Sequence, residues 1–550
     1  MSRPLLRAPP FPGMDASVTG PGTDTAAALS PEAIDRVFTG IREAQVGGCF
    51  WASPSADVGA TAILRCRAGD DVAQAQSMLT ETERGGAIRI APEDGAEHGT
   101  RSARRGERQV DPWSLLGRAT TLVAHGDDEW AAIAVIAGAR VRLLSAGRFG
   151  APGDEAAQLR KIVAEGIARV KYRDPFTGDD ASLDEAVALL GDWRRMLDAN
   201  RGIVAACGIS WWKRREIARF LWTPERALRF FRSERRALSH AAQLGGAVAI
   251  WPSRVSEGLS GSAAEKNVPL VRVEDGFVRS VGLGSNLVPP ASVTVDRRGI
   301  HYDPGRPSDL EHILAGADFP PALLARAGRL RETMVNAGIS KYGNGAAHAF
   351  PPRRVGRRLV LFPGQVEDDM SVHFGGGGLS SNLDLLRRVR ALEPESEIWF
   401  RPHPDVDAGH RKGAVRDSDA LDHADRIVRG GGMASLLDHV DAVHVLTSLT
   451  GFEALVRRRE VICHGVPFYA GWGLTRDLAD VPDRRGRQLT LDQLIAAVLI
   501  VYPRYLDPVT DLPCPPEMLI RRIGEGAARN RLGWATSLRQ AQGRLLRRWI

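Results

Sequence analysis

The sequence predicts an α/β protein whose second half folds into two Rossmann-like lobes. Short apolar runs alternate with helix-like runs over residues 241–515, and polar motifs follow directly after several of the apolar runs. Alternation of this kind is typical of parallel βαβ units. Ligands of such sheets bind at the carboxyl ends of the strands. The motifs that follow strands are therefore the candidates for chemistry.

The individual elements are predicted from the length and spacing of their apolar residues. Short, mostly apolar runs indicate buried strands at residues 247–251, 270–273, 359–362, 398–400 and 442–446. Longer runs with apolar residues at helical spacing indicate helices at residues 323–335, 382–392 and 491–499.

The length and composition are those of a globular protein with several domains. A chain of 550 residues is too long for one compact core, so two or three domains are expected. The sequence has neither an apolar run long enough to cross a membrane nor an apolar signal segment near its start. Its five cysteines are widely spaced, which favours reduced thiols and gives no metal signal. A cytoplasmic protein is expected.

The net charge of +7 suggests an anionic partner. An electropositive surface suits a nucleotide, an acidic glycan or an anionic lipid. No RNA- or DNA-binding motif is present, so no nucleic-acid partner is expected. Two segments rich in aromatic residues and Arg, at residues 211–231 and 534–550, are candidates for an interfacial helix on the inner membrane. The alternative is a helix packed on its own domain.

Changes in composition and periodicity divide the chain into six parts. The first part is rich in Pro, Gly and Ala, and the third carries many aromatic residues and Arg. In chain order they are a flexible leader (1–40), a first α/β region (41–200), a helical linker (201–240), an N-terminal lobe (241–355), a C-terminal nucleotide-binding lobe (356–515) and a basic amphipathic helix (516–550).

The first α/β region repeats part of the C-terminal lobe. Residues 114–116, followed by a strand and a helix, match a similar pattern in that lobe, and the Tyr-x-Asp-Pro-x-Thr pattern that starts at Tyr172 recurs at Tyr505. The first copy has lost part of the motif, because Ile133 occupies the position where the second copy has Glu453. We therefore expect a degenerate partial module without activity. The alternative is a chance likeness between two βαβ units.

An acidic pair follows the strand predicted at residues 270–273. Glu274 and Asp275 repel each other, and burial of such a pair raises at least one pKa. An active site is one reason to keep two carboxylates together at a strand end. Gly276 allows a tight turn and the close approach of a ligand. The alternative is a solvated turn.

Two further strands end in candidate phosphate- and nucleotide-binding residues. Arg401 and His403 can bind a phosphate and neutralise one that departs, and the prolines on either side of His403 fix its backbone. The alternative is a histidine that only hydrogen-bonds a backbone carbonyl. After another strand, Gly364 permits close backbone contact, and Gln365 could reach a base or a sugar.

The strand predicted at residues 442–446 leads into a helix start with hydroxyl groups and a glycine. Thr447, Ser448 and Gly451 make this a candidate anion site, because free N–H groups and the helix dipole point at the ligand there. Glu453, one turn further on, could accept hydrogen bonds from a ribose. The alternative for Ser448 is simple N-capping.

These motifs, in this order, resemble the retaining β-Kdo transferases of capsule export systems, the KpsC type. The resemblance covers roughly residues 240–515, about half of the chain, and includes residues 469–473 (YAGWG). It implies a GT-B fold, with the donor CMP-Kdo between two Rossmann-like lobes. KpsC-type proteins usually carry two full transferase modules, and the first is apparently truncated here. Bacterial sialyltransferases share the acidic and His-Pro motifs more loosely.

The resemblance also implies roles for the candidate residues. Asp275 would be the nucleophile or essential carboxylate with Glu274 beside it, His403 would contact the CMP phosphate, and Ser448 with Glu453 would hold the cytidine ribose. A β product from CMP-Kdo requires net retention, which two inversions through a covalent adduct provide. No cofactor and no metal would be needed, because CMP is a monophosphate with little charge to offset.

The implied partners are CMP-Kdo, a lipid-linked or oligosaccharide acceptor, capsule-assembly proteins and the surface of the inner membrane. Two other functions stay open at this point. One is a transferase for another CMP-activated ulosonic acid, such as a sialic acid. The other is a non-catalytic scaffold of a capsule-assembly complex.

Overall fold

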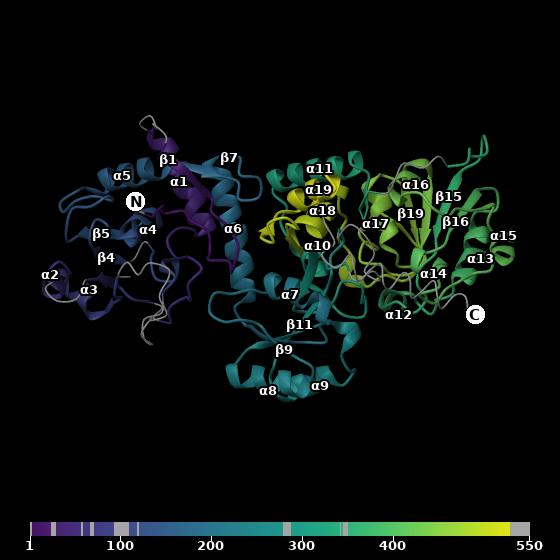
Figure 1. Ribbon diagram of the computed structural model, residues 1–550, viewed down its shortest axis with the longest axis horizontal. Coiled ribbons are helices and arrows are strands. Elements are labelled where there is room, and N and C mark those ends of the chain that lie inside the picture. The colour runs from purple at the N-terminus through teal and green to yellow at the C-terminus, as the bar shows by residue number, and fades with distance from the viewer. Residues whose placement is uncertain are drawn as a thin grey trace. The chain divides into compact units, whose positions relative to one another are not determined.

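The chain folds into two compact units, and all the predicted site residues lie in the second (Figure 1). Unit 1 comprises residues 1–201 and 221–227, and unit 2 comprises residues 202–220 and 228–550. No helix among the described residues is both long and apolar enough to cross a membrane. The structure is a computed structural model that describes residues 3–23, 29–56, 59–66, 71–92, 109–117, 120–278, 288–340, 343–344 and 350–527.

The first lobe of unit 2 is built on a mixed seven-stranded sheet. Strands β8 to β11 of this sheet are parallel, and the remaining three run antiparallel to their neighbours. Helices α8 (Glu234–Leu244) and α9 (Leu259–Glu265) pack against it and bury a core of small apolar side chains. In sheet order the strands are β22 (Pro513–Cys514), β21 (Pro503–Leu506), β12 (Ser292–Asp296), β11 (Leu270–Asp275), β10 (Ala247–Ile250), β8 (Ile203–Cys207) and β9 (Arg229–Phe231).

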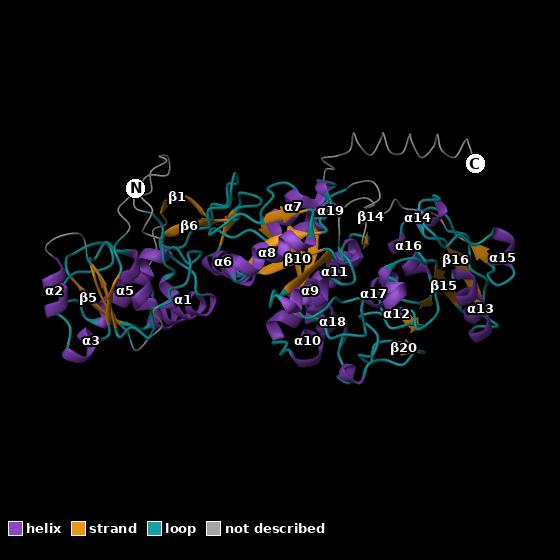
Figure 2. Ribbon diagram, turned by 90° about the horizontal axis from the view of Figure 1, so that it is seen from below, coloured by secondary structure: helices purple, strands orange, loops and turns teal. Residues whose placement is uncertain are grey.

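The second lobe has a six-stranded, fully parallel sheet with helices on both faces (Figure 2). Val360 and Phe362 share a core with helix α13 (Asn382–Leu392), whereas Leu359 and Leu361 point to the opposite face, with α16 (Met433–His439) and α17 (Leu449–Val456). The strand alternation thus produces the predicted Rossmann-like layering. In sheet order the strands are β17 (Arg426–Ile427), β16 (Glu397–Arg401), β15 (Leu359–Pro363), β18 (Ala442–Val445), β19 (Glu460–Cys463) and β20 (Arg476–Asp477).

Eight further α-helices are described in unit 2. The predicted helices at residues 323–335 and 491–499 are confirmed, although the second continues as a π-helix (Ala496–Val501). In chain order these helices are α7 (Arg214–Phe220), α10 (Asp309–Gly316), α11 (Pro321–Asn336), α12 (Met370–Gly375), α14 (Pro404–Asp407), α15 (Asp417–Leu421), α18 (Leu491–Ile495) and α19 (Pro516–Gly524).

The end of the described chain returns from the second lobe to the first. Strand β21 pairs with β12, so Tyr505 lies opposite Ser292, and α19 packs with α11 and α18 around one shared core. The predicted C-terminal lobe (356–515) therefore extends too far, because residues 503–514 belong to the first sheet. Their pairing partner lies far earlier in the chain, where a local pattern cannot indicate it. Of the predicted C-terminal helix (516–550), α19 is described, and the rest lies outside the described residues.

The segment predicted to be a helical linker (201–240) is instead part of the first lobe. Strand β8 is fully buried in the sheet, and β9 forms its edge. Both strands are short, and β9 contains Arg229 and two phenylalanines, a composition that also fits an amphipathic helix. The basic aromatic segment at residues 211–231 is thus packed on its own domain, one of the two alternatives drawn from the sequence.

Unit 1 is a smaller α/β body with two sheets. Its parallel sheet has the order β3 (Ala87–Arg89), β2 (Ala62–Arg65), β4 (Thr121–Ala124), β5 (Arg140–Leu143), and its antiparallel sheet the order β1 (Thr19–Thr23), β6 (Val170–Arg173), β7 (Asp180–Ala181). The helices are α1 (Pro31–Ala44), α2 (Asp71–Ser77), α3 (Glu81–Gly85), α4 (Glu129–Ala137), α5 (Ala156–Ala168) and α6 (Leu183–Asn200).

The segment predicted to be a flexible leader (1–40) contributes to the core of unit 1. Strand β1 pairs with β6, and Leu6, Val18 and Phe38 are each at most 1% exposed. The segment is rich in Pro, Gly and Ala, but it also contains a small number of apolar residues that are buried. These residues find their partners only in distant parts of the chain, so composition alone gave the wrong prediction.

The repeat predicted from the sequence has a structural counterpart. The order β3-β2-β4-β5 in unit 1 corresponds to β16-β15-β18-β19 in unit 2, with parallel pairing in both. The hydroxyls of Tyr172 and Tyr505 each donate to a carbonyl of the preceding helical segment, over 3.0 and 2.7 Å. Each tyrosine strand then pairs with the short strand after its turn. These agreements favour a duplication over a chance likeness.

Candidate active site

The acidic motif ends strand β11 and is fixed at the junction of the two lobes. The Gly276 N–H donates to the Ser292 carbonyl over 3.0 Å, and a side chain at Gly276 would overlap that of Ser292. Phe277 then packs on Phe468 of the second lobe, with 4.7 Å between the ring centroids. Glycine is required here for close approach to β12, and the aromatic contact holds the turn in place.

Asp275 forms an ion pair that the sequence did not indicate. The Nζ of Lys213 lies 3.0 Å from Oδ1 of Asp275 and 3.4 Å from the ring centroid of Trp251. Lys213 is only 7% exposed, and a buried ammonium needs a partner of opposite charge. It comes from the short helical turn Trp211–Lys213, in the supposed linker. The pair keeps a negative charge on Asp275 favourable inside the protein.

Glu274 belongs to a second acidic cluster, made by both lobes. Burial and the charge of Asp275 raise the pKa of Glu274 to about 7, and Asp369 at the start of α12 adds to the repulsion. Burial, with the charges of Glu274 and Asp369, also raises the pKa of Tyr302. The buried Tyr302 hydroxyl has no hydrogen-bond partner among the described residues. An unpaired polar group of this kind is a candidate for ligand contact, and sequence reasoning missed it.

Gly364 and Gln365 connect three strand ends of the second lobe through hydrogen bonds. The Gly364 N–H donates to the Arg401 carbonyl over 2.8 Å. The Oε1 atom of Gln365 accepts from the Thr447 N–H over 3.4 Å. The side chain of Asn382 accepts from the Gln365 N–H over 3.0 Å and donates to the Gln365 carbonyl over 2.8 Å. The side chain of Gln365 therefore positions the next strand end, while its contact with a base or sugar stays a prediction.

Ser448 is the N-cap of α17, the simpler of the two roles predicted for it. Its Oγ accepts from the Thr450 N–H over 3.2 Å, and its carbonyl accepts from the Tyr469 hydroxyl over 2.5 Å. A side chain at Gly451 would overlap the Tyr469 hydroxyl, so this glycine lets residues 469–473 pack on the helix. Glu453 is 9% exposed, one turn into α17. The N-terminus of α17 keeps the dipole and N–H groups of an anion site.

Arg401 and His403 are both held by backbone groups. The guanidinium of Arg401 donates to the carbonyls of Gly430 and Gly431, over 2.7 Å each, and burial lowers its pKa. Arg401 thus fixes a neighbouring turn, while its predicted phosphate contact stays a prediction. The Nδ1 atom of His403 accepts from the Asp405 N–H over 3.1 Å and caps α14. A neutral His403 therefore carries its proton on Nε2, which suits donation to a phosphate oxygen.

The structure brings the three predicted segments to the same region. Strands β16, β15 and β18 are adjacent and parallel, so residues 401–403, 364–365 and 447–448 share one edge of the sheet. The rings of Phe277 and Phe452 lie 6.3 Å apart. Phe277 is two residues after the second carboxylate of the acidic motif, and Phe452 immediately precedes the α17 glutamate. The end of β11 and the start of α17 therefore lie close together in unit 2, as the candidate site requires.

The equivalent edge of unit 1 is filled by an ion pair. Arg65, at the end of β2, binds Asp128 with N–O distances of 2.7 and 3.3 Å, and stacks 4.5 Å from the ring centroid of Trp130. Asp128 caps α4 as Ser448 caps α17. Ile133 is completely buried where the second copy has its glutamate. The corresponding strand edge of unit 1 is thus occupied by an internal ion pair, and the absence of activity in the first module stays a prediction.

Comparison with known proteins identifies the family. Residues 246–505 match the family described as capsule polysaccharide biosynthesis protein. The lipopolysaccharide-processing protein LpsZ of Rhizobium meliloti is 40% identical over 328 residues, which cover 58% of this chain and 74% of LpsZ. The chain belongs to the capsule polysaccharide biosynthesis family. The family resemblance drawn from the sequence is thereby confirmed.

One of the relatives is longer than this chain. The capsule polysaccharide modification protein LipA of Neisseria meningitidis serogroup A is 40% identical over 352 residues, which cover 64% of this chain and 50% of LipA. The chain thus spans half the length of that relative. Among solved structures, the KpsC β-Kdo 2,7 transferase of Thermosulfurimonas dismutans is 33% identical and covers 59% of this chain and 99% of its own, with a TM-score of 0.49.

Proposed function

We propose that unit 2 is a retaining glycosyltransferase that moves Kdo from CMP-Kdo onto a lipid-linked capsule polysaccharide acceptor. One observation carries the proposal: the acidic pair at the end of β11 meets a second lobe whose strand ends present His403 and the N-terminus of α17. The family supports a role in capsule synthesis, and the motif resemblance supports the sugar. A lipid-linked acceptor would place the enzyme on the cytoplasmic face of the inner membrane, beside capsule-assembly proteins.

In this proposal the reaction proceeds by two displacements. The Asp275 carboxylate attacks the anomeric carbon of Kdo, and the bond from that carbon to the CMP phosphate oxygen breaks. Nε2–H of His403 and the α17 N-terminus stabilise the departing phosphate. An acceptor hydroxyl then attacks the same carbon and releases Asp275. Two inversions give net retention. Glu274, with its pKa of about 7, is suited to take the hydroxyl proton.

Lys213 and Tyr302 complete this scheme. The Lys213 ammonium holds Asp275 in its charged, nucleophilic form and stays in place when the ester forms and breaks. The unpaired Tyr302 hydroxyl is positioned to donate to a sugar oxygen. No metal or cofactor takes part, so turnover should be unchanged by EDTA.

The experiment is incubation of the full chain with CMP-Kdo and a synthetic Kdo-lipid acceptor, followed by mass spectrometry and NMR. The proposal requires addition of Kdo with a β anomeric linkage. Transfer only from CMP-sialic acid would contradict the assigned sugar, and an α linkage would contradict retention. Tight CMP binding without turnover of any CMP-sugar would indicate a scaffold instead of an enzyme.

A further inference from the structure

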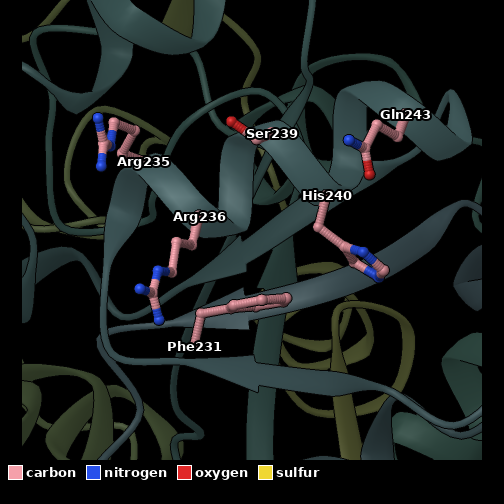
Figure 3. Close-up of a pocket in the computed structure, with 6 residues that line it drawn as sticks. All are labelled: Phe231, Arg235, Arg236, Ser239, His240 and Gln243. Carbon is pink, nitrogen blue, oxygen red and sulfur yellow. The ribbon is translucent and has the colours of Figure 1, made fainter.

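A basic groove runs along the outer edge of the first lobe. It has a volume of about 400 Å³ and lies between edge strand β9 and helix α8, within the size range of small-molecule sites. Figure 3 shows Arg236 and His240 extending from α8 toward the ring of Phe231 on β9. Its lining residues are Phe231, Arg235, Arg236, Ser239, His240 and Gln243.

The arginines of this region carry uncompensated charge. Arg229, Arg232, Arg235 and Arg236 are all exposed, and none forms an ion pair with a carboxylate among the described residues. The nearby Glu234 is engaged elsewhere, because it accepts hydrogen bonds from the backbone and hydroxyl of Ser256 over 2.8 and 2.5 Å. Many other arginines of unit 2 are paired, as the ion pairs with Glu311 and Asp511 show. Four such arginines in eight consecutive residues attract an anionic ligand.

The floor of the groove suits a sugar better than a bare phosphate. Phe231 is half-buried, and its ring centroid lies 5.3 Å from that of His240 with the planes tilted by 45°. An aromatic surface can cover the apolar face of a pyranose. Ser239 and Gln243 add hydrogen-bonding groups for hydroxyls, and guanidinium groups bind carboxylates in a bidentate geometry.

Phe231, at one end of the groove, lies near the carboxyl ends of the parallel strands, as the acidic pair does. Strands β9, β8, β10 and β11 are adjacent, and Phe231 aligns through this register with Arg272, three residues before Asp275. Three strand spacings and three residues of rise separate Phe231 from Asp275 by on the order of 17 Å. The side chain of Asp275 faces the other side of the sheet, since it is an odd number of residues from Arg272. A chain of a few sugars can span this distance by passing over the carboxyl ends of the strands.

We propose that the β9–α8 groove binds an acidic oligosaccharide, namely the already built part of the acceptor chain. This inference rests on the proposed function for the identity of the chain. The half-buried ring of Phe231 lies among guanidinium, imidazole, hydroxyl and amide groups, which favours a glycan over a membrane surface, because a membrane anchor projects its apolar side chains outward.

Direct binding tests the groove without any turnover. The probe is a fluorescently labelled synthetic Kdo tetrasaccharide, titrated into the full chain in the absence of CMP-Kdo. We expect Arg235→Ala/Arg236→Ala to weaken its binding about tenfold, and Phe231→Ala to weaken it as well. The matched control is Arg387→Ala/Arg388→Ala, which removes two adjacent exposed arginines from the equally long helix α13. That control should change the affinity less than twofold.

Two outcomes overturn the inference. One is an equal loss of affinity in the groove variant and in the α13 control, which would assign the binding to net charge alone. The other is loss of binding to phosphatidylglycerol-containing vesicles with unchanged tetrasaccharide affinity, which would assign the groove to the membrane. Because neither measurement uses the donor, a failed transfer assay would leave this test intact.

Discussion

Lys213 and the acidic pair show how burial differentiates two neighbouring carboxylates. The negative charge of Asp275 is compensated by the Lys213 ammonium 3.0 Å away. Burial and the charge of Asp275 raise the pKa of Glu274 to about 7, and Asp369 adds to the repulsion. One carboxylate is thereby suited to act as a nucleophile and the other as a base near neutral pH.

Replacing Glu274 by Gln should remove a pH dependence. A base with a pKa of about 7 is protonated below that pH, so wild-type kcat should rise about tenfold per unit up to pH 7 and then level off. The Glu274→Gln variant should lose at least about 100-fold in kcat and show no inflection near 7. The measurement is a pH–rate profile for both proteins. An unchanged inflection in the variant would remove Glu274 from the role of base.

Replacing Lys213 by Met should impair the reaction by leaving Asp275 without its counter-charge. We expect kcat to fall by about 100-fold, while Lys213→Arg, which keeps the charge, retains much more activity. Steady-state kinetics of both variants, with thermal unfolding as the check on folding, makes the comparison. Equal activity of the Met and Arg variants would show that the charge of Lys213 is irrelevant.

At the scale of elements, the two copies of the parallel sheet differ in what occupies the strand edge. In unit 2 this edge carries His403 and the α17 N-terminus, whereas in unit 1 Arg65 and Asp128 fill it with a buried ion pair. The same strand order thus carries the candidate ligand site in one copy and an internal contact in the other.

Arg65→Ala should destabilise unit 1 and spare the reaction. Removal of one partner of a buried ion pair leaves Asp128 uncompensated, and we expect the free energy of unfolding of unit 1 to fall by about 3 kcal/mol. Hydrogen exchange of strands β2 and β4 reports this loss, and transfer kinetics of the folded variant should match the wild type. A variant that folds normally but cannot transfer Kdo would give unit 1 a part in the reaction.

The sequence predicted the elements of the second lobe well because its strands are buried on both faces and its helices follow them directly. It predicted the first lobe less well. Strands β8 and β9 contain short or mixed runs, and β21 pairs with β12 far earlier in the chain. Lys213 was missed for the same reason, since nothing local marks a lysine whose partner is Asp275. The predicted site residues lie at strand ends or, for Gly451 and Glu453, in helix α17, as expected. The side chains of Arg401 and Gln365 bind backbone groups, which the sequence did not indicate.

At the scale of the whole molecule, a buried histidine pair should make stability depend on pH. Nδ1 of His444 lies 3.0 Å from Nε2 of His464. Burial lowers the pKa of His464 to about 3, and burial also outweighs the nearby Glu393 to lower that of His444. Both rings are neutral when folded and take up protons when unfolded below about pH 6.5. Stability is therefore full above that pH and is lost as the pH falls.

For His464 alone the free energy of unfolding should drop by about 2 kcal/mol between pH 7.5 and pH 5. Urea denaturation across this range measures the drop. The His464→Gln variant should show a shallower dependence, whatever its stability at pH 7.5. An identical slope in wild type and variant would contradict the assignment.

The central claim is that Asp275 forms the covalent bond to the sugar. Its most direct measurement is peptide mass spectrometry of the full chain after brief exposure to CMP-Kdo without acceptor. The account predicts a mass increase of one Kdo residue on Asp275 in the wild type, and neither adduct nor turnover in Asp275→Asn. An adduct on Glu274, or undiminished transfer by Asp275→Asn, would contradict it.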